Sequence, residues 1–384
     1  MIYPRTKLIS QFHEFFTGSQ SKYTIIVGEL GIGKTTFLEL IKTNSLFEGN
    51  SIAHIHITED SPLNLQIIDY DTIILFIDSD VGISFSEIRT FIESNSFNGR
   101  VILTNTEQVE DENVENFVLP GISFREYSEG MGHTVDVGTI MSGNANISEY
   151  NALRDTYIHL GQYPINLNDS THVDVGFSDK LAIMNQELFK KEEGDFLEFI
   201  RTVAMNVGDI FKEERIAKNM NISRRKVRKY TEIMLKYNLI KAIGPWVENT
   251  DVELSRHVKV YFTDLSYFYA ALGVSYYHGE NKQGVIENFI LGELDRKLKS
   301  THDIRFYRKK SGAEVSFVLI EKNTGKITPI EVTTRSSEII PQALKSFYET
   351  YSDRIDHAMI MNDSIATRKD INGSPIIILP HIAI

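Results

Sequence analysis

The pattern G-x-x-x-x-G-K-[ST] occupies residues 28–35, in the stretch GELGIGKT. Such a loop can turn its backbone N–H groups inward around phosphate oxygens, because glycines permit the tight turn and the following helix adds partial positive charge. The Lys34 ammonium can reach the β- and γ-phosphates, and the Thr35 hydroxyl can bind Mg²⁺. The sequence therefore predicts a site for ATP and Mg²⁺. The residues expected to contact the nucleotide are Gly28, Glu29, Leu30, Gly31, Ile32, Gly33, Lys34, Thr35 and Thr36.

A second pattern, TIILFIDSD, joins an apolar run to carboxylates at residues 72–80. A buried parallel strand ending at Asp78 would place this carboxylate beside Thr35, where it would hold Mg²⁺ through water. Many related ATPases follow this aspartate with a glutamate that polarises the attacking water, whereas here Ser79 follows. Asp80 is one residue further on, and strand alternation directs its side chain differently. We expect nucleotide binding, and hydrolysis stays open.

Residues 100–105, RVILTN, form a third strand with a polar end. Asn105, or Thr104, lies where a γ-phosphate sensor would be found, although a residue that closes the strand in a turn is the alternative. Asp78, Asp80 and Asn105 are thus the candidate catalytic residues. His54 and His56 share one face of a strand expected at 51–57. Because no third ligand is evident, we expect these histidines to pack or to lie at the surface rather than to bind metal.

These side chains need a sheet to position them. Short apolar segments alternate with helical segments over the first part of the chain, which predicts a parallel α/β sheet with its ligand at the carboxyl ends of the strands. The expected strands are 23–27, 51–57, 72–80, 100–105 and 117–119, and a helix is expected at 84–94. Helical stretches at 149–160 and 179–189 predict a lid. Arg5 is expected to be either a solvated charge or a nucleotide contact.

A cluster of positive charge begins the second of two helices expected at 211–220 and 224–237. The turn between them, ending in the capping residue Ser223, gives helix-turn-helix geometry, and a strand pair at 240–246 and 257–262 would form a wing. This geometry predicts contact with duplex DNA. The alternative is a structural or protein-binding module whose charges are solvated. The candidate DNA contacts are Arg224, Arg225, Lys226, Arg228 and Lys229.

Composition sets outer bounds on these interpretations. The chain has 384 residues, 42% of them hydrophobic, and a net charge of −12, which argues against a chain coated in positive charge but allows a local basic patch. It has no cysteine, which excludes disulfides and thiolate sites. No signal peptide and no apolar run of about 20 residues is found, so a cytoplasmic protein without membrane contact is expected.

Beyond the basic helix, the expected order is a helix at 285–298, a hairpin at 305–320, a strand at 326–334, a helix at 339–349 and a strand at 357–362.

With these motifs the chain resembles the prokaryotic AAA-type P-loop ATPases that carry a C-terminal winged helix and a restriction-endonuclease-like domain of unknown function. The resembling stretches are GELGIGKTT, LFIDSD, VILTN, FVLPGISFREY, LGQYP, KVYFTDLS, ENFILGEL, FYRKKSGAEVSF and PIEVTT.

The resemblance implies strand order 5-1-4-3-2 in the ATPase core and a final domain similar to PD-(D/E)XK nucleases. The nuclease positions correspond to Glu287, Ser316, Glu331 and Thr333, with Glu314 one pleat from Ser316. A serine cannot supply the charge that Mg²⁺ needs, and a threonine cannot replace the lysine. We therefore expect an inactive nuclease-like domain that serves binding or assembly. Only if Glu287, Glu314 and Glu331 form a shifted site would the chain be a metal-dependent nuclease.

The resemblance also implies an arginine finger supplied in trans, for which Arg125 and Arg154 are candidates. The expected domains are a P-loop core (1–120), a helical lid (121–195), a winged helix (196–265) and the nuclease-like domain (266–384). The function expected is an AAA-type ATPase associated with DNA, whose nucleotide state controls the lid and winged helix. The alternative is a nucleotide-dependent switch that binds protein partners or a second copy and hydrolyses little ATP.

Overall fold

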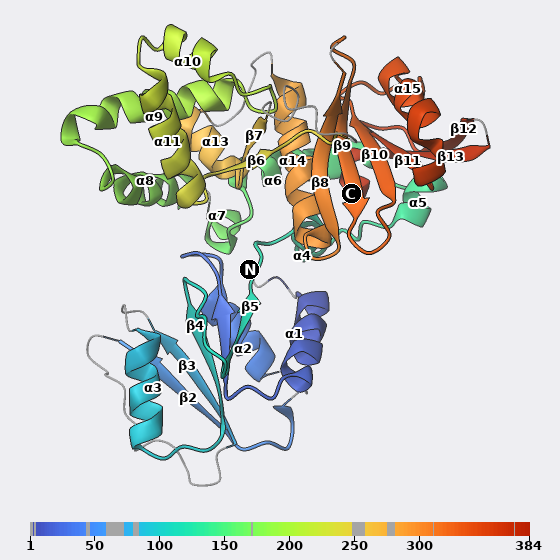
Figure 1. The fold of residues 1–384 in the computed structure, drawn as a ribbon. Coiled ribbons are helices and arrows are strands. Elements are labelled where there is room, and N and C mark those ends of the chain that lie inside the picture. The colour runs from blue at the N-terminus through green and yellow to red at the C-terminus, as the bar shows by residue number, and fades with distance from the viewer. Residues whose placement is uncertain are drawn as a thin grey trace. The chain divides into compact units, whose positions relative to one another are not determined.

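The computed structural model describes residues 3, 5–43, 47–58, 73–79, 84–169, 172–247, 258–274, 281–309, 311–371 and 373–384. The chain divides into two compact units (Figure 1). The first comprises Met1–Ile122 and Tyr163–Asn168, and the second comprises Ser123–Gln162 and Asp169–Ile384. The further division of the second unit into lid, winged helix and nuclease-like domain stays a prediction.

The first unit is built on a parallel five-stranded sheet in the order β2-β3-β4-β1-β5. This is the strand order 5-1-4-3-2 that the resemblance implied, read from the other edge. The last strand begins before the expected residue 117, and the other strands lie within two residues of their expected bounds. The strands are β1 (Tyr23–Val27), β2 (Ile52–Ile57), β3 (Ile74–Ser79), β4 (Arg100–Asn105) and β5 (Val114–Val118).

Helices cover both faces of this sheet. On one face, Ile88 and Ile92 of α3 (Phe85–Ser94) enter the apolar core formed by alternate residues of the strands. On the other face, Phe12 of α1 (Thr6–Gly18) contacts Phe37 of α2 (Lys34–Lys42), with ring centroids 5.8 Å apart. Figure 1 shows α3 on one side of the strands and α1 with α2 on the other. The sheet is therefore buried, as the continuous apolar strands predict.

The second unit begins with helices and a small β-ribbon. The two expected helices of the basic module are present, and β6 pairs with β7 in antiparallel fashion. The helix expected at 179–189 ends earlier, at Asn185. The elements are α4 (Phe124–Gly130), α5 (Val137–Met141), α6 (Ile147–Leu160), α8 (His172–Asn185), α9 (Glu193–Met205), α10 (Glu213–Asn219), α11 (Arg224–Lys236), β6 (Ile240–Ile243), β7 (Lys259–Phe262) and α13 (Leu265–Leu272).

A mixed six-stranded sheet in the order β12-β13-β11-β10-β9-β8 completes this unit. The hairpin, strand and helix order expected from sequence is present, and the last two strands were not expected. These elements are α14 (Lys282–Leu298), β8 (His302–Arg308), β9 (Glu314–Glu321), β10 (Ile327–Val332), α15 (Gln342–Tyr351), β11 (Ala358–Asn362), β12 (Thr367–Ile371) and β13 (Ser374–Pro380).

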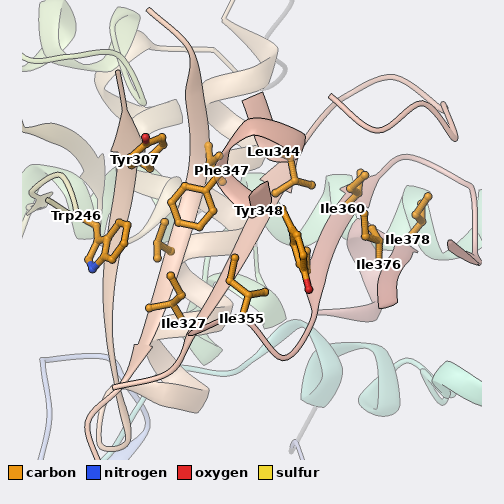
Figure 2. Packing of buried hydrophobic residues seen from close by; sticks show 13 residues of the cluster. Trp246, Tyr307, Ile327, Leu344, Phe347, Tyr348, Ile355, Ile360, Ile376 and Ile378 are labelled. Atoms are coloured by element: carbon orange, nitrogen blue, oxygen red, sulfur yellow. The ribbon is translucent and has the colours of Figure 1, made fainter. Parts of the chain in front are cut away.

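The main apolar core of this sheet lies between the strands and α15 (Figure 2). Phe347 of α15 lies 4.7 Å from Tyr307 of β8 and 5.5 Å from Trp246, measured between ring centroids. The wing strand expected at 240–246 is therefore too long: β6 ends at Ile243, and the Trp246 side chain packs into this core while its backbone N–H donates to the Phe306 carbonyl at 2.6 Å. Burial of the large indole ring outweighs continuation of the ribbon.

Candidate functional site

The P-loop sequence connects the buried strand β1 to α2 in the first unit. All five residues of β1 are buried, and the strand leads directly into Gly28, whose N–H donates to the Asn105 carbonyl at 3.1 Å. Gly33 caps α2 with φ of 90°, a left-handed conformation that favours glycine. The first N–H groups of α2 are thereby left at the carboxyl end of the sheet, where an anion can accept from them.

The Lys34 side chain folds back into the loop that precedes α2. Its Nζ donates to the carbonyl oxygens of Gly28 at 2.9 Å and Glu29 at 3.0 Å. Burial lowers the pKa of the Lys34 ammonium, while the carboxylates of Asp78 and Glu29 act in the opposite direction. Because carbonyl oxygens solvate this ammonium, a phosphate could take their place as its partner.

Asp78 ends the buried part of β3 and is 2% exposed. The Thr104 hydroxyl donates to its Oδ1 at 2.5 Å. No hydrogen-bond donor among the described residues reaches the buried Oδ2, and the His56 Nδ1 lies 3.8 Å from it. A buried carboxylate oxygen without a donor is costly, so this atom suits a cation or a water molecule held by one.

This chemistry fits Mg²⁺ bound together with a nucleotide. Mg²⁺ takes one or two protein oxygens and otherwise uses water and phosphate oxygens. Thr35 is exposed in the first turn of α2, and Asp78, whose charge acts on the adjacent Lys34, offers its second oxygen in the same unit. Within the described ranges, no group of three or more His, Cys, Asp or Glu side chains is arranged for metal binding. The residues suit an ion that arrives with phosphate oxygens rather than one held by the protein alone.

The strand-end residue in contact with Asp78 is Thr104, one of the two expected alternatives. The Nδ2 of Asn105 donates to the Glu107 carbonyl at 2.9 Å. Asp80, the other candidate catalytic carboxylate, lies outside the described residues. Its role stays a prediction. Ser79 is the last residue of β3.

A segment from far along the chain covers the P-loop. The Tyr163 hydroxyl donates to the Glu29 carboxylate, and α7 (Pro164–Asn168) follows within the first unit. A Cβ added to Gly33 would lie 3.2 Å from Cγ of Pro164. Sequence reasoning marked LGQYP only as a point of resemblance and gave it no site role. Gly161, Tyr163 and Pro164 of this stretch were the sequence signal that could have indicated such a role.

The other nucleotide-contact candidates differ in exposure. Leu30 is 79% exposed at the tip of the loop, whereas Ile32 is 4% exposed and packs against Gly28. Thr36 is exposed on α2, and Gly31 has a φ of 78°. The loop therefore offers backbone groups and Lys34 to a ligand, and Ile32 serves the fold of the loop.

Arg5 and the arginine-finger candidates have defined partners. Arg5 is 5% exposed and donates to the Pro120 carbonyl at 2.7 Å, so the expectation of a solvated charge was wrong. Arg154 is 2% exposed and contacts Asp363 at 3.3 Å, so its guanidinium is buried within the second unit. Arg125 is exposed and pairs with Glu129 on its own helix at 3.1 Å.

The basic helix α11 is paired with carboxylates of its own unit. Four of its five N-terminal cations make such ion pairs: Arg224–Glu214, Lys226–Asp195 (2.5 Å), Arg228–Glu213 (2.8 Å) and Lys229–Glu192 (2.9 Å). Arg225 is exposed, and no ion pair joins it to another described residue. Ser223 caps the helix through the Lys226 N–H at 3.2 Å, as expected. Sequence reasoning did not foresee the carboxylates, because they come from three other segments.

The structure brings together four of the five positions predicted for a degenerate nuclease site. Glu287 on α14 is 6% exposed and accepts from the Ser316 hydroxyl at 3.3 Å. The Ser316 N–H points to the Glu331 carboxyl at 3.4 Å. Burial raises the pKa of Glu331 to about 8, opposed by the Ser316 N–H and reinforced by the charges of Glu287 and Glu314. We call Glu287, Glu314 and Glu331 the acidic centre.

A lysine that sequence reasoning missed enters the acidic centre from β7. Lys259 is 3% exposed, lies 3.2 Å from Glu287 and pairs with Glu314. Burial alone would lower the pKa of this ammonium, but the carboxylates of Glu287 and Glu314 raise it above its ordinary value. Thr333, the fifth predicted position, accepts a hydrogen bond from the Arg335 N–H at 3.2 Å through its hydroxyl.

Comparisons with known proteins cover parts of this architecture. A family described as Domain of unknown function (DUF8612) matches residues 184–277, and another, Domain of unknown function (DUF4143), matches residues 282–381. The first match covers α9 to α13, and the second covers α14 to the end of the six-stranded sheet. No curated protein matches the chain in sequence.

Two solved structures are similar to the chain. One is a DNA replication initiation factor, with 12% identity, a TM-score of 0.25, and coverage of 60% of this chain and 90% of that one. The other is a STAND signal transduction ATPase with a tetratricopeptide repeat sensor from Pyrococcus horikoshii, with 13% identity and a TM-score of 0.24. That match covers 77% of this chain and 45% of that one. Likeness at these scores carries no argument about function.

A helix that spans a membrane must be both long and apolar. None within the described ranges combines sufficient length with sufficient apolarity to cross a bilayer.

Proposed function

We propose that the first unit binds a nucleoside triphosphate, with ATP as the expected ligand, together with Mg²⁺. One observation supports the proposal: the buried Asp78 Oδ2 lacks a hydrogen-bond donor among the described residues, and the Asp78 carboxylate acts electrostatically on Lys34, the first residue of α2. An oxygen for the metal, an ammonium for the phosphates and unpaired helix N–H groups are the three parts that phosphate loops combine. The AAA-type assignment is part of this proposal and is supported by the strand order.

A thermal unfolding experiment tests the binding of ATP. A ligand that binds only the folded chain raises Tm, and binding at about a hundred times Kd adds about 2.7 kcal/mol to the free energy of unfolding. We expect ATP with Mg²⁺ to raise Tm of the full chain, and Lys34→Ala to remove that rise. Lys42→Ala, a lysine of the same helix that pairs with Glu39 at 2.7 Å, is the matched control. An unchanged Tm of the wild type at millimolar ATP would defeat the proposal.

The same site also supports a switch with little hydrolysis. The observation that favours it is Ser79, which follows Asp78 where a water-polarising carboxylate would be needed. Binding would then favour one conformation, with a protein partner or a second copy as the reader of that state. A mass that is independent of concentration and of ATP would count against this alternative.

Contact with duplex DNA is the second candidate function. Two helices joined by a short turn and followed by an antiparallel ribbon favour it, as do the exposed guanidinium groups of Arg224, Arg225 and Arg228. Exposed ion pairs contribute only about 0–1 kcal/mol each, so phosphates can replace their carboxylates. The salt dependence described in the Discussion tests this candidate.

A further inference from the structure

The acidic centre gathers its carboxylates from three elements of the second unit. Glu287 comes from α14, Glu314 from the start of β9, and Glu331 from β10, and α14 packs against β8 and β10 (Figure 1). Like charges that converge in a poorly solvated place repel one another unless a cation lies among them. The fold therefore needs a counter-ion here.

The chain supplies that counter-ion from β7. The Lys259 ammonium lies 3.2 Å from Oε2 of Glu287 and also pairs with Glu314, so it bridges α14 and β9. Its ammonium lies over the ring of Phe306, 5.6 Å from the centroid. The backbone of Lys259 is fixed by its register with Ile243 of β6 and by a bridge to Ile210. The ammonium is thus held in place from both ends of the side chain.

Two cations balance the charges of Glu287 and Glu314. Arg308 contacts the second oxygen of Glu314 at 2.9 Å, so two cations face the carboxylates of Glu287 and Glu314. The Tyr261 hydroxyl donates to Glu287 at 2.9 Å and completes its shell. With Lys259 in place, the carboxylates of the acidic centre do not form a group that could hold a metal ion, and neither does any other described group of three or more such side chains.

We propose that Lys259 is the resident cation of the acidic centre: its ammonium takes the place of a divalent metal ion, and a chain that lacks it binds Mn²⁺ or Mg²⁺ between Glu287, Glu314 and Glu331. The centre is consequently inert toward metal in the natural chain and joins the β6–β7 ribbon to the large sheet. The proposal is independent of nucleotide binding in the first unit.

The test is Mn²⁺ binding to the full chain carrying Asp78→Asn, which removes the carboxylate of the other candidate cation site. Adding Lys259→Met should create a site for about one Mn²⁺ per chain. Mn²⁺ should then raise Tm by about 3 °C or more. Lys259→Arg keeps the charge and should bind no Mn²⁺. Lys241→Met is the matched control, because Lys241 on β6 pairs with Asp295 away from the acidic centre.

Two results would overturn the proposal. One is a folded Lys259→Met chain whose Tm and Mn²⁺ uptake equal those of its parent. The other is that the chain with Lys259 intact binds Mn²⁺, or cleaves plasmid DNA when Mn²⁺ is present, and that Glu287→Gln abolishes this binding or cleavage. This second arm needs no folded Lys259 variant, so a Lys259→Met chain that fails to fold leaves the proposal testable.

Discussion

Asp78 connects the sequence pattern of the first unit to its chemistry. The carboxylate has one oxygen satisfied by Thr104 at 2.5 Å and another without a hydrogen-bond donor among the described residues. Buried polar groups are normally hydrogen-bonded, so the second oxygen of this carboxylate is available to a further partner. The uneven pairing of this one side chain supports the proposed cation site.

Asp78→Asn should therefore separate nucleotide binding from metal binding. An amide can still accept from Thr104 but cannot attract Mg²⁺. We expect Mg²⁺ to strengthen ATP binding to the wild type by about tenfold or more, which corresponds to about 1.4 kcal/mol. In the variant this gain should vanish while metal-free ATP binding persists. Titrations with and without Mg²⁺ measure it, with Asp111→Asn, an aspartate that pairs with Arg89 at 2.6 Å, as control. Equal Mg²⁺ dependence in wild type and Asp78→Asn would contradict the assignment.

Glu331 gives the second unit a stability that depends on pH. An unfolded glutamate loses its proton near pH 4.5, whereas the folded Glu331 keeps its proton up to about 8. Between these values the folded chain binds one more proton than the unfolded chain, so the free energy of unfolding falls as pH rises, by at most about 1.36 kcal/mol per pH unit.

Glu331→Gln should flatten this part of the pH dependence. Between about pH 5.5 and about pH 7.5, we expect the wild type to lose about 2 kcal/mol more than the variant. Urea denaturation at the two pH values measures the difference. The exposed Glu349→Gln on α15 is the control. Parallel pH profiles for wild type and Glu331→Gln would show that Glu331 is ionised in the folded chain.

At the scale of elements, α11 carries the clearest test of the DNA candidate. Each phosphate contact releases a counter-ion and adds about 0.9 to the slope of log K against log salt concentration. Arg225→Ala should lower that slope by about 1 and weaken binding to all duplex sequences alike. Lys236→Ala, at the other end of the helix and paired with Glu187 at 2.6 Å, should leave the slope unchanged. Absence of duplex binding at low salt would exclude this function for α11.

The elements could be predicted from sequence where their periodicity was strong. The parallel strands of the first unit and α11 lie close to their expected bounds, because apolar runs and the Ser223 cap are local signals. The strands β12 and β13 were missed although Asn-Gly at 372–373, between Ile371 and the apolar run at 376–379, is a hairpin signal. The composition of the sites was harder to predict. Thr104 was one of two alternatives at its strand end, whereas Lys259 and Tyr163 each reach a site through tertiary contacts that no local spacing encodes.

At the scale of the whole molecule, the chain passes between the two units at residues 122/123, 162/163 and 168/169. At the second of these positions the chain enters the first unit, where Tyr163 donates to Glu29 and Pro164 lies next to Gly33 of the P-loop. If a nucleotide alters the loop, the polypeptide on either side of α7 offers a covalent route by which the second unit would respond. The net charge of −12 restricts any nucleic-acid contact to a local surface such as α11.

The most direct test is to measure ATP retention and ATP turnover in one preparation of the full chain, by equilibrium dialysis with Mg²⁺, with and without duplex DNA. The account predicts about one ATP retained per chain, and retention weakened at least about tenfold by Lys34→Ala. Turnover lost in Lys34→Ala and stimulated by DNA would identify a working DNA-coupled ATPase, and retention without turnover would favour the switch. A wild type that retains no ATP, or a Lys34→Ala variant that retains as much, would contradict the account.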